Sequence, residues 1–304
     1  MYRAFIREED SPSEIDACLA RAIIGLCASL SRLGHTDDAL KHIEEAVDIL
    51  RYLFHRDTAY KAGLSVALNN MANYSRDANN HTLALCAINE SIILREELVL
   101  SIPELYKADL AASLLNASTC YSKVPYLHQL ALEIAIRAVC IAEELVKENP
   151  GKFSGHLGAA LHNRAHRRLA RWQNSAAYDD IKKAVEIRRA LATLRPDVYR
   201  GGLIRSLTIA KFLARQCQDG DAEVAFRDEL QSLCKLGGPD YNDIAVNAAP
   251  QLASYPHFGG RDRTKIRYHV SGNIASPFML ATATTCIDQI VSPRYIDRRR
   301  RNWN

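Results

Sequence analysis

Three similar stretches decide the fold: LSVALNNMANY at residues 64–74, LAASLLNASTCY at residues 110–121 and LGAALHNRAH at residues 157–166. In each stretch the apolar residues recur every three or four positions, which is the spacing of one face of an α-helix. The same pattern extends to both sides, where the opening leucines form the row Leu19, Leu64, Leu110, Leu157 and Leu203. We therefore expect five repeated units, each 45 to 47 residues long and each opening with a helix.

The start of each first helix is marked in the sequence. Seven positions before the leucines stand Pro12, Asp57, Pro103, Pro150 and Pro196. Proline is well tolerated in the first turn of a helix, because the first N–H groups have no acceptor within the helix. The five units are therefore predicted to start near residues 12, 57, 103, 150 and 196.

A second set of columns predicts a second helix in each unit. A small residue recurs at Ala39, Ala84, Ala131, Ala177 and Ala222, and an aliphatic residue follows eight positions later at Val47, Ile92, Val139, Val185 and Leu230. Alanine allows two helix backbones to approach closely, and the aliphatic residues supply an apolar stripe. Each unit is then a helical hairpin that buries this stripe only against its neighbours. An irregular bundle is the alternative, but it gives no reason for several columns to keep the same spacing.

Composition indicates an ordinary soluble protein, with 304 residues of which 48% are apolar and 24% are charged. No stretch reaches the roughly 20 apolar residues of a membrane-spanning helix, and the start MYRAFIREED lacks the apolar run of a signal peptide. The eight cysteines are scattered without a CxxC pair, which indicates neither a disulfide framework nor a zinc site. We expect a cytoplasmic protein without membrane contact, with the nucleus as an alternative.

Charge and proline both change near residue 237. Residues 1–236 hold 30 Lys or Arg and 30 Asp or Glu, whereas residues 237–304 hold nine basic and five acidic residues and half of the ten prolines. We expect a repeat array over residues 1–236 and an irregular, partly disordered basic segment over residues 237–304. Since the array is neutral, salt should matter little to its binding. Nucleic acid is not an expected partner, and only the tail arginines Arg298, Arg299, Arg300 and Arg301 could contribute to binding it.

The repeat resembles the tetratricopeptide repeat (TPR) family in its long form of about 42 to 46 residues, as in kinesin light chains and large fungal TPR families. The resemblance rests on the block from Pro103 to Leu145, on the asparagines at Asn70, Asn116 and Asn163, and on LGHTDDALKHIEEAVDIL at residues 33–50. It implies an all-α fold, a right-handed α-solenoid of five hairpins whose first helices line a concave groove. Unit one departs from the pattern with Gly25 at the asparagine position, and unit five departs with Ile209.

The resemblance also implies a function, which is to bind a peptide or helix of a partner protein in the groove. Matched position by position, the groove-lining residues are Asn69, Asn70, Asn73, Asn116, Thr119, His162, Asn163, His166, Arg205, Thr208 and Phe212. An asparagine amide can both donate to a peptide carbonyl and accept from a peptide N–H. Alternatively, Asn70, Asn116 and Asn163 bond to the neighbouring helix and stabilise the stack without meeting a ligand.

The sequence predicts no enzymatic site and no cofactor. His162 and His166 have the spacing of two zinc ligands on a helix, but Asn163 stands where a zinc protease would carry its glutamate. No GxGxxG, GxxxxGK[ST] or GxSxG motif occurs. We expect an interaction scaffold. The alternative is the sensor or regulatory portion of a larger signalling protein, of nucleotide-binding or CHAT type, whose catalytic domain lies elsewhere.

Overall fold

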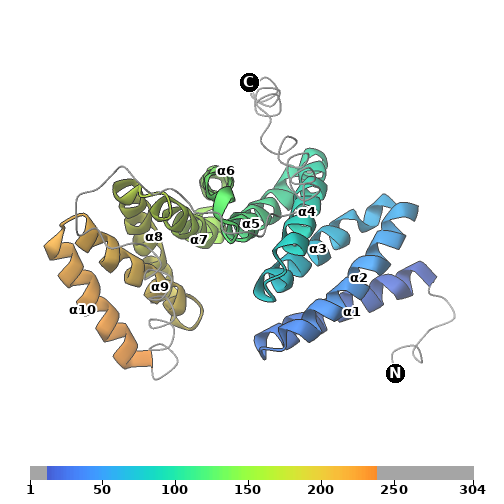
Figure 1. Cartoon of the computed structure of the whole chain (residues 1–304), viewed down its shortest axis with the longest axis horizontal. Coiled ribbons are helices and arrows are strands. Elements are labelled where there is room, and N and C mark those ends of the chain that lie inside the picture. Colours follow the sequence, from blue (N-terminus) through green and yellow to red (C-terminus); the bar gives the residue numbers. More distant parts are fainter. Residues whose placement is uncertain (1–11, 238–304) are drawn as a thin grey trace, which may run out of the picture.

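The computed structural model describes residues 12–237, and the regular structure in this range is entirely helical. The five predicted units are five consecutive hairpins (Figure 1). Their helices are α1 (Pro12–Arg32) with α2 (Thr36–Arg56), α3 (Lys61–Asp77) with α4 (His81–Ser101), α5 (Pro103–Tyr121) with α6 (His128–Glu148), α7 (Pro150–Leu169) with α8 (Asn174–Leu194), and α9 (Pro196–Gln216) with α10 (Gly220–Gly237). The prediction of an all-α array of hairpins is confirmed. The predicted irregular segment and its arginine tail lie outside the described residues.

The helix ends follow the local sequence. Prolines occupy the first turn of α5, α7 and α9. Unit two has Asp57 in place of proline, and its carboxylate accepts a hydrogen bond from the Ala59 backbone N–H at 2.8 Å. A short 3₁₀ helix, η2 (Thr58–Tyr60), then leads into α3. Asp57 therefore caps the chain where the other units rely on a proline ring.

Four of the five hairpins turn through one residue in the left-handed backbone region. These residues are Gly34, Asn79, Trp172 and Gln218, with φ values of 85°, 59°, 62° and 60°. The N–H of the next residue then bonds back to the end of the first helix, as from His35 to the Leu30 carbonyl at 2.9 Å. This is the usual way to satisfy the last carbonyls of a helix. The turn of unit three instead contains a 3₁₀ helix, η3 (Pro125–Leu127).

The repeat columns found in the sequence form the core. The alanine column is fully or almost fully buried in units one to four, at Ala39, Ala84, Ala131 and Ala177. The aliphatic residues eight positions later are buried in all five units. They form two continuous apolar clusters, one ending at Ala138 and the other beginning at Val139. Helix α6 therefore joins the two halves of the core.

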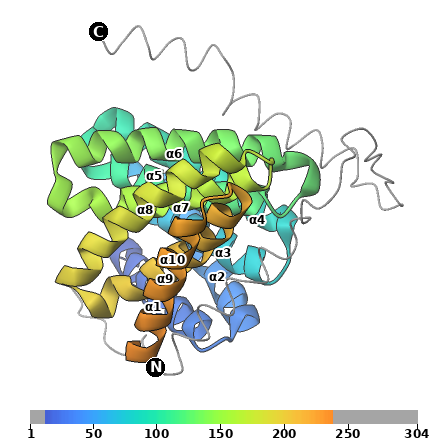
Figure 2. The same ribbon diagram turned by 90° about the vertical axis from the view of Figure 1, so that its left-hand side faces the viewer.

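The hairpins follow a curve. The first helices also touch one another along the array, α1 with α3, α3 with α5, and α5 with α7, and no comparable contact links second helices within residues 12–237. The first helices therefore lie on the inside of the curve, which Figure 1 shows as an arch. Figure 2 shows that the hairpins also rotate along the array, since α5 and α6 lie across the view and α10 stands nearly upright. We call α1, α3, α5, α7 and α9 the inner row.

None of the helices in residues 12–237 has the length and apolarity needed to cross a lipid bilayer.

Candidate functional site: the inner row of first helices

Polar side chains join the first helices of units two and three. The amide oxygen of Asn69 on α3 accepts hydrogen bonds from the Ser113 hydroxyl at 3.1 Å and from the Asn116 amide at 3.0 Å, both on α5. Asn69 and Ser113 are buried, and Asn116 is half-buried. Asn116 thus bonds to the neighbouring repeat.

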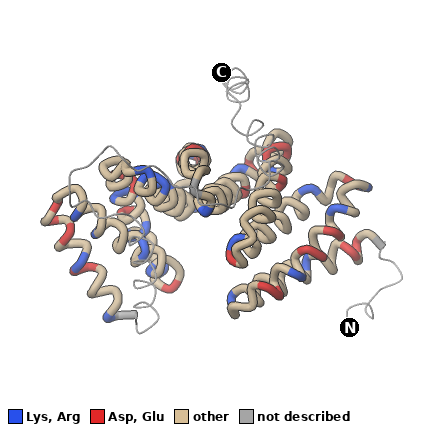
Figure 3. The backbone as a smooth tube through the Cα atoms, in the orientation of Figure 1, with Lys and Arg blue, Asp and Glu red and all other residues tan. Residues whose placement is uncertain are grey.

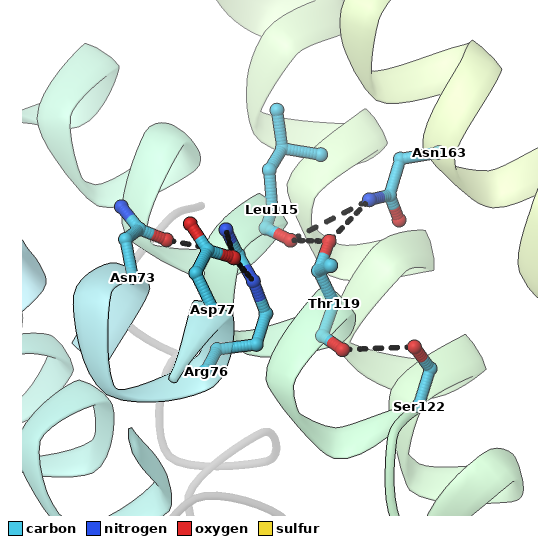
Figure 4. A network of polar contacts seen from close by, with 7 residues as sticks. All are labelled: Asn73, Arg76, Asp77, Leu115, Thr119, Ser122 and Asn163. Atoms are coloured by element: carbon cyan, nitrogen blue, oxygen red, sulfur yellow. Dashed lines mark hydrogen bonds and ion pairs between the residues drawn. The ribbon is translucent and has the colours of Figure 1, made fainter. Parts of the chain in front are cut away.

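A second network joins units three and four (Figure 4). The amide nitrogen of Asn163 on α7 donates to the Thr119 hydroxyl at 3.1 Å, and its amide oxygen accepts from the Ser118 hydroxyl at 2.9 Å. Thr119 itself donates to the Leu115 carbonyl of its own helix at 3.0 Å. Both polar atoms of Asn163 are therefore engaged with α5.

These contacts separate the members of the asparagine column. Asn116 and Asn163 each bond to the first helix of a neighbouring unit, which is the contact that the second interpretation of the column expects. Asn70 is different, because its half-buried side chain makes no hydrogen bond to any residue in 12–237. Asn70 is therefore the member of the column with neither amide atom engaged within residues 12–237.

The other residues predicted to line the groove differ in how far they are exposed and in whether their polar atoms are already hydrogen-bonded. Asn73 is half-buried and accepts a hydrogen bond from Arg76 at 2.9 Å (Figure 4). Thr208 is buried and donates to the Ile204 carbonyl, so its hydroxyl does not reach the surface. Phe212 is half-buried at the edge of the second apolar cluster, and Arg205 is exposed.

His162 and His166 of α7 lie together beside α9. The Nδ1 atom of His162 is 3.0 Å from the Ser206 hydroxyl of α9, and the two imidazole centroids are 5.0 Å apart in an edge-to-face arrangement. Burial, reinforced by nearby arginines, holds the pKa of His162 well below its ordinary value and lowers the pKa of His166 to about 3. Both rings are therefore neutral at physiological pH. Residues 12–237 contain no group of three or more His, Cys, Asp or Glu side chains that could hold a metal ion.

Two arginines of the second helices are equivalent in position and were not identified from the sequence. Arg95 and Arg188 each follow the repeat alanine by eleven positions. Arg95 donates to the Ser113 hydroxyl at 2.7 Å and to the Asp109 carbonyl. Arg188 donates to the Ser206 hydroxyl at 2.6 Å and to the Gly202 carbonyl at 2.8 Å. Each arginine thus ties a second helix to the first helix of the next unit.

At this repeat position, arginine alternates with an apolar residue from one junction to the next. The positions equivalent to Arg95 in units one and three are Leu50 and Ala142, which are buried. A methyl group added to Gly63 on α3 would lie 3.2 Å from the Leu50 side chain, which shows how closely the first junction packs. The sequence does contain a signal for the alternation, since each arginine precedes a unit that carries a serine three positions after its repeat leucine.

The helices divide the charge of the array unequally. The first helices carry 13 Lys or Arg and six Asp or Glu, a net charge of +7. The second helices carry 12 Lys or Arg and 19 Asp or Glu, a net charge of −7. The positive charge lies on α7 and α9, which together hold eight basic residues and one acidic residue, and can be followed in Figure 3. Neutrality of the whole array therefore hides an excess of positive charge on the first helices of units four and five.

Comparison with known proteins agrees with this architecture. No protein-family model matches the sequence, and no curated protein matches it. The structure is similar to a crystal structure from Podosopora anserina described as "putative kinesin light chain nearly identical TPR-like repeats", with a TM-score of 0.52 and 16% identity over 74% of this chain and 96% of that one. A variant of that protein gives a TM-score of 0.54 and 16% identity over 72% of this chain and 95% of the other.

The chain has the fold of TPR-like repeats. The resemblance seen in the sequence is thus confirmed at the level of the fold, and the TPR-like array resembles kinesin light chain repeats in structure. Solenoids of this kind commonly use an extended concave surface for binding. In this chain, the first helices of the inner row lie on the concave side of the array.

Proposed function

We propose that this TPR-like array is a non-catalytic interaction scaffold that holds an extended or helical segment of a partner protein along its inner row. The main support for this proposal is that the inner row is continuous from one unit to the next. Contacts between first helices run from α1 to α7, and the His162–Ser206 contact at 3.0 Å extends them to α9. A ligand segment can therefore meet several units at once.

The arrangement of side chains supports binding without catalysis. Hydrogen bonds between repeats hold the inner row in place at Asn69, Asn116 and Asn163. Apart from these fixed groups, Asn70 on α3 offers a free amide and Phe212 on α9 offers part of an aromatic ring. A free amide suits a peptide backbone, and an aromatic face suits an apolar side chain.

Site-specific photo-crosslinking tests the proposal. A benzoylphenylalanine residue at position 70 or 212 places the probe on the inner row of the full chain. The matched controls carry it at position 52 or 136, because Tyr52 and Ile136 are exposed on the second helices α2 and α6. Each variant is irradiated in cell extract, and its adducts are identified by mass spectrometry.

We expect one partner protein to be crosslinked from positions 70 and 212 and not from positions 52 and 136. Peptide mapping of the adduct should place both crosslinks within one short segment of that partner. Adducts formed equally from both sets of positions, or only from the second helices, would contradict the assignment of the inner row.

A further inference from the structure

The geometry points to a second binding surface, at the hairpin turns of units three and four: we propose that the aromatic rings of Tyr126 and Trp172, with the cations Lys123 and Arg171, bind single-stranded nucleic acid. This inference goes beyond the proposed function, because it concerns the ends of two hairpins and a different class of ligand.

The two turns lie side by side on one edge of the array. The turn of unit three comprises residues 122–127, and the turn of unit four comprises residues 170–173. The helices that lead into them are joined, since Asn163 of α7 bonds to Ser118 of α5 at 2.9 Å, in the region shown in Figure 4. The Arg167 guanidinium also lies 3.5 Å from the Ser118 carbonyl oxygen, and both residues belong to the last turn of their helices. The turns that follow are therefore neighbours.

Both turns expose an aromatic ring. Tyr126 is 66% exposed and Trp172 is 45% exposed. Trp172 has a left-handed backbone with φ of 62°, at the turn position where units one, two and five have Gly34, Asn79 and Gln218. A bulky residue is disfavoured in this conformation, and strain of this kind is often found at functional sites. Since nearly half of the Trp172 surface is exposed, core packing does not explain why a tryptophan stands there.

The same edge is rich in basic residues. Residues 118–132, around the first turn, contain Lys123 and no Asp or Glu. Residues 164–178, around the second turn, contain four arginines and no Asp or Glu. The first carboxylate after residue 132 is Glu133, which accepts a hydrogen bond from Gln129 at 2.8 Å.

Only some of these cations are neutralised within the fold. Arg164 and Arg168 both pair with the buried carboxylate of Asp180. Lys123 and Arg171 are exposed, and neither takes part in an ion pair among residues 12–237. Two cations thus remain available to an anionic ligand beside the two rings.

Electrostatics agree that the cations of unit four act on the turn of unit three. His128 directly follows that turn, at the start of α6. Its pKa is lowered by burial and then by the charges of Arg167 and Arg171. The two turns therefore share one region of positive potential.

A single strand of nucleic acid carries both of the groups that this edge can bind. Unpaired bases stack on aromatic rings, and phosphates pair with exposed cations. The bases of a duplex are already stacked on one another, so a ring on a turn does not reach their faces. The sequence pointed only to the tail arginines for nucleic acid, because Lys123 and Arg171 belong to different repeats and come together only in the fold.

Fluorescence anisotropy with the full chain and a labelled strand of roughly ten uridines tests the inference. Trp172→Asn removes the ring and introduces the residue that unit two has at Asn79, so the turn should keep its conformation. Arg171→Gln removes one exposed charge. The matched control Arg195→Gln removes an exposed charge from the opposite edge, where α8 ends and α9 begins. A further variant replaces the four arginines of residues 298–301 with glutamine.

We expect the single strand to bind at least about fivefold more tightly than the same strand in a duplex. Trp172→Asn should weaken binding about tenfold, as for the loss of one stacked base. Arg171→Gln should lower the slope of log K against log salt by about 0.7, as for the loss of one phosphate contact. Arg195→Gln should leave the affinity and the slope unchanged. Circular dichroism checks that every variant keeps the wild-type helicity.

Tryptophan fluorescence reports the stacking directly. The chain contains two tryptophans, so Trp303→Phe leaves Trp172 as the single emitter. We expect the uridine strand to quench this emission. An abasic strand of the same length, which keeps the phosphates and lacks the bases, should bind more weakly and leave the emission unchanged.

Absence of binding, equal effects of Arg171→Gln and Arg195→Gln, or equal quenching by the abasic strand would overturn the inference. Binding that depends on residues 298–301 and not on Trp172 would assign the nucleic acid to the tail and overturn it as well. So would an acidic peptide that binds more tightly than the uridine strand with the same dependence on Trp172. Photo-crosslinking from positions 70 and 212 probes the inner row, so its outcome is independent of this test.

Discussion

Arg95 and Arg188 occupy the same repeat position, yet the two halves of the array use them differently. Both donate to a serine and a backbone carbonyl of the next first helix. Burial lowers the pKa of Arg95, but the nearby Asp109 carboxylate opposes the shift. The neighbour of Arg188 is instead a second arginine, Arg205, which adds to the shift. The first arginine is part of the internal structure, and the second leaves uncompensated charge at the inner surface.

This difference shows that one repeat position can keep its contact with the next first helix while the charge around it changes. In units two and three the inner row is built from amides and hydroxyls that satisfy one another. In units four and five, one histidine and one arginine, His162 and Arg188, share the Ser206 hydroxyl. The conserved geometry of the hairpin thus supports a neutral surface at one end and a basic surface at the other.

The largest expected effect comes from removing Asp180, the carboxylate of a buried ion cluster in the basic half of the array. Asp180 is buried, and its carboxylate accepts hydrogen bonds from Arg164 at 2.9 and 2.6 Å and pairs with Arg168 at 2.8 Å. Asp180→Ala leaves two arginines without this counter-charge and should lower the free energy of unfolding by about 3–5 kcal/mol. Urea denaturation measures the change.

The adjacent Asp179→Ala is the control, because Asp179 is exposed and pairs only with Lys182 at 3.5 Å. It should shift the free energy of unfolding by less than about 0.5 kcal/mol. Similar losses for the two variants would show that the buried ion cluster does not stabilise unit four.

A second prediction compares the two arginines directly. Arg95→Ala should lower the free energy of unfolding by about 2–3 kcal/mol, since it leaves buried acceptors on α5 without their charged donor. Arg188→Ala should lower it by roughly half as much, because its removal also relieves repulsion with Arg205. The measurement is urea denaturation of both variants at low and high salt.

The salt dependence of the two stability losses should separate the two arginines more clearly. Added salt screens the repulsion around Arg188, so the loss caused by Arg188→Ala should grow with ionic strength, while the loss caused by Arg95→Ala should stay nearly constant. Leu50→Ala, at the equivalent position of an apolar junction, provides a salt-independent reference. Identical salt dependence for the two arginine variants would refute the proposed difference.

The smallest expected effect is on the pH dependence of the free energy of unfolding. The native pKa of His166 is about 3 and its ordinary value is 6.5, so on acidification the unfolded chain binds the proton first. The stability contributed by the neutral ring is complete above about pH 6.5 and declines as the pH falls toward 3. His166→Gln should therefore lose less stability than the wild type between pH 7 and pH 5, by roughly 2 kcal/mol. Thermal unfolding across this range measures the slope, with His55→Gln at an exposed position as control.

Much of the fold could be predicted because the relevant contacts recur at a fixed spacing. The alanine column and the aliphatic residues eight positions later are buried as expected, since helix crossings repeat with the unit. The candidate site was less predictable. Asn70, Asn116 and Asn163 share one column, but Asn116 and Asn163 bond across repeats and Asn70 does not. Their roles depend on which neighbour stands opposite, and that neighbour changes from unit to unit.

The sequence by itself determined the number of hairpins, their boundaries and their apolar faces, because burial of a periodic stripe requires only that like units stack. Tertiary structure alone decided which polar groups satisfy one another and which charged helices lie side by side. The first helices carry a net charge of +7 and the second helices a net charge of −7, and folding brings the first helices into contact with one another. Electrostatic forces depend on distance and not on sequence order, so the basic inner surface emerges only when the hairpins are placed side by side.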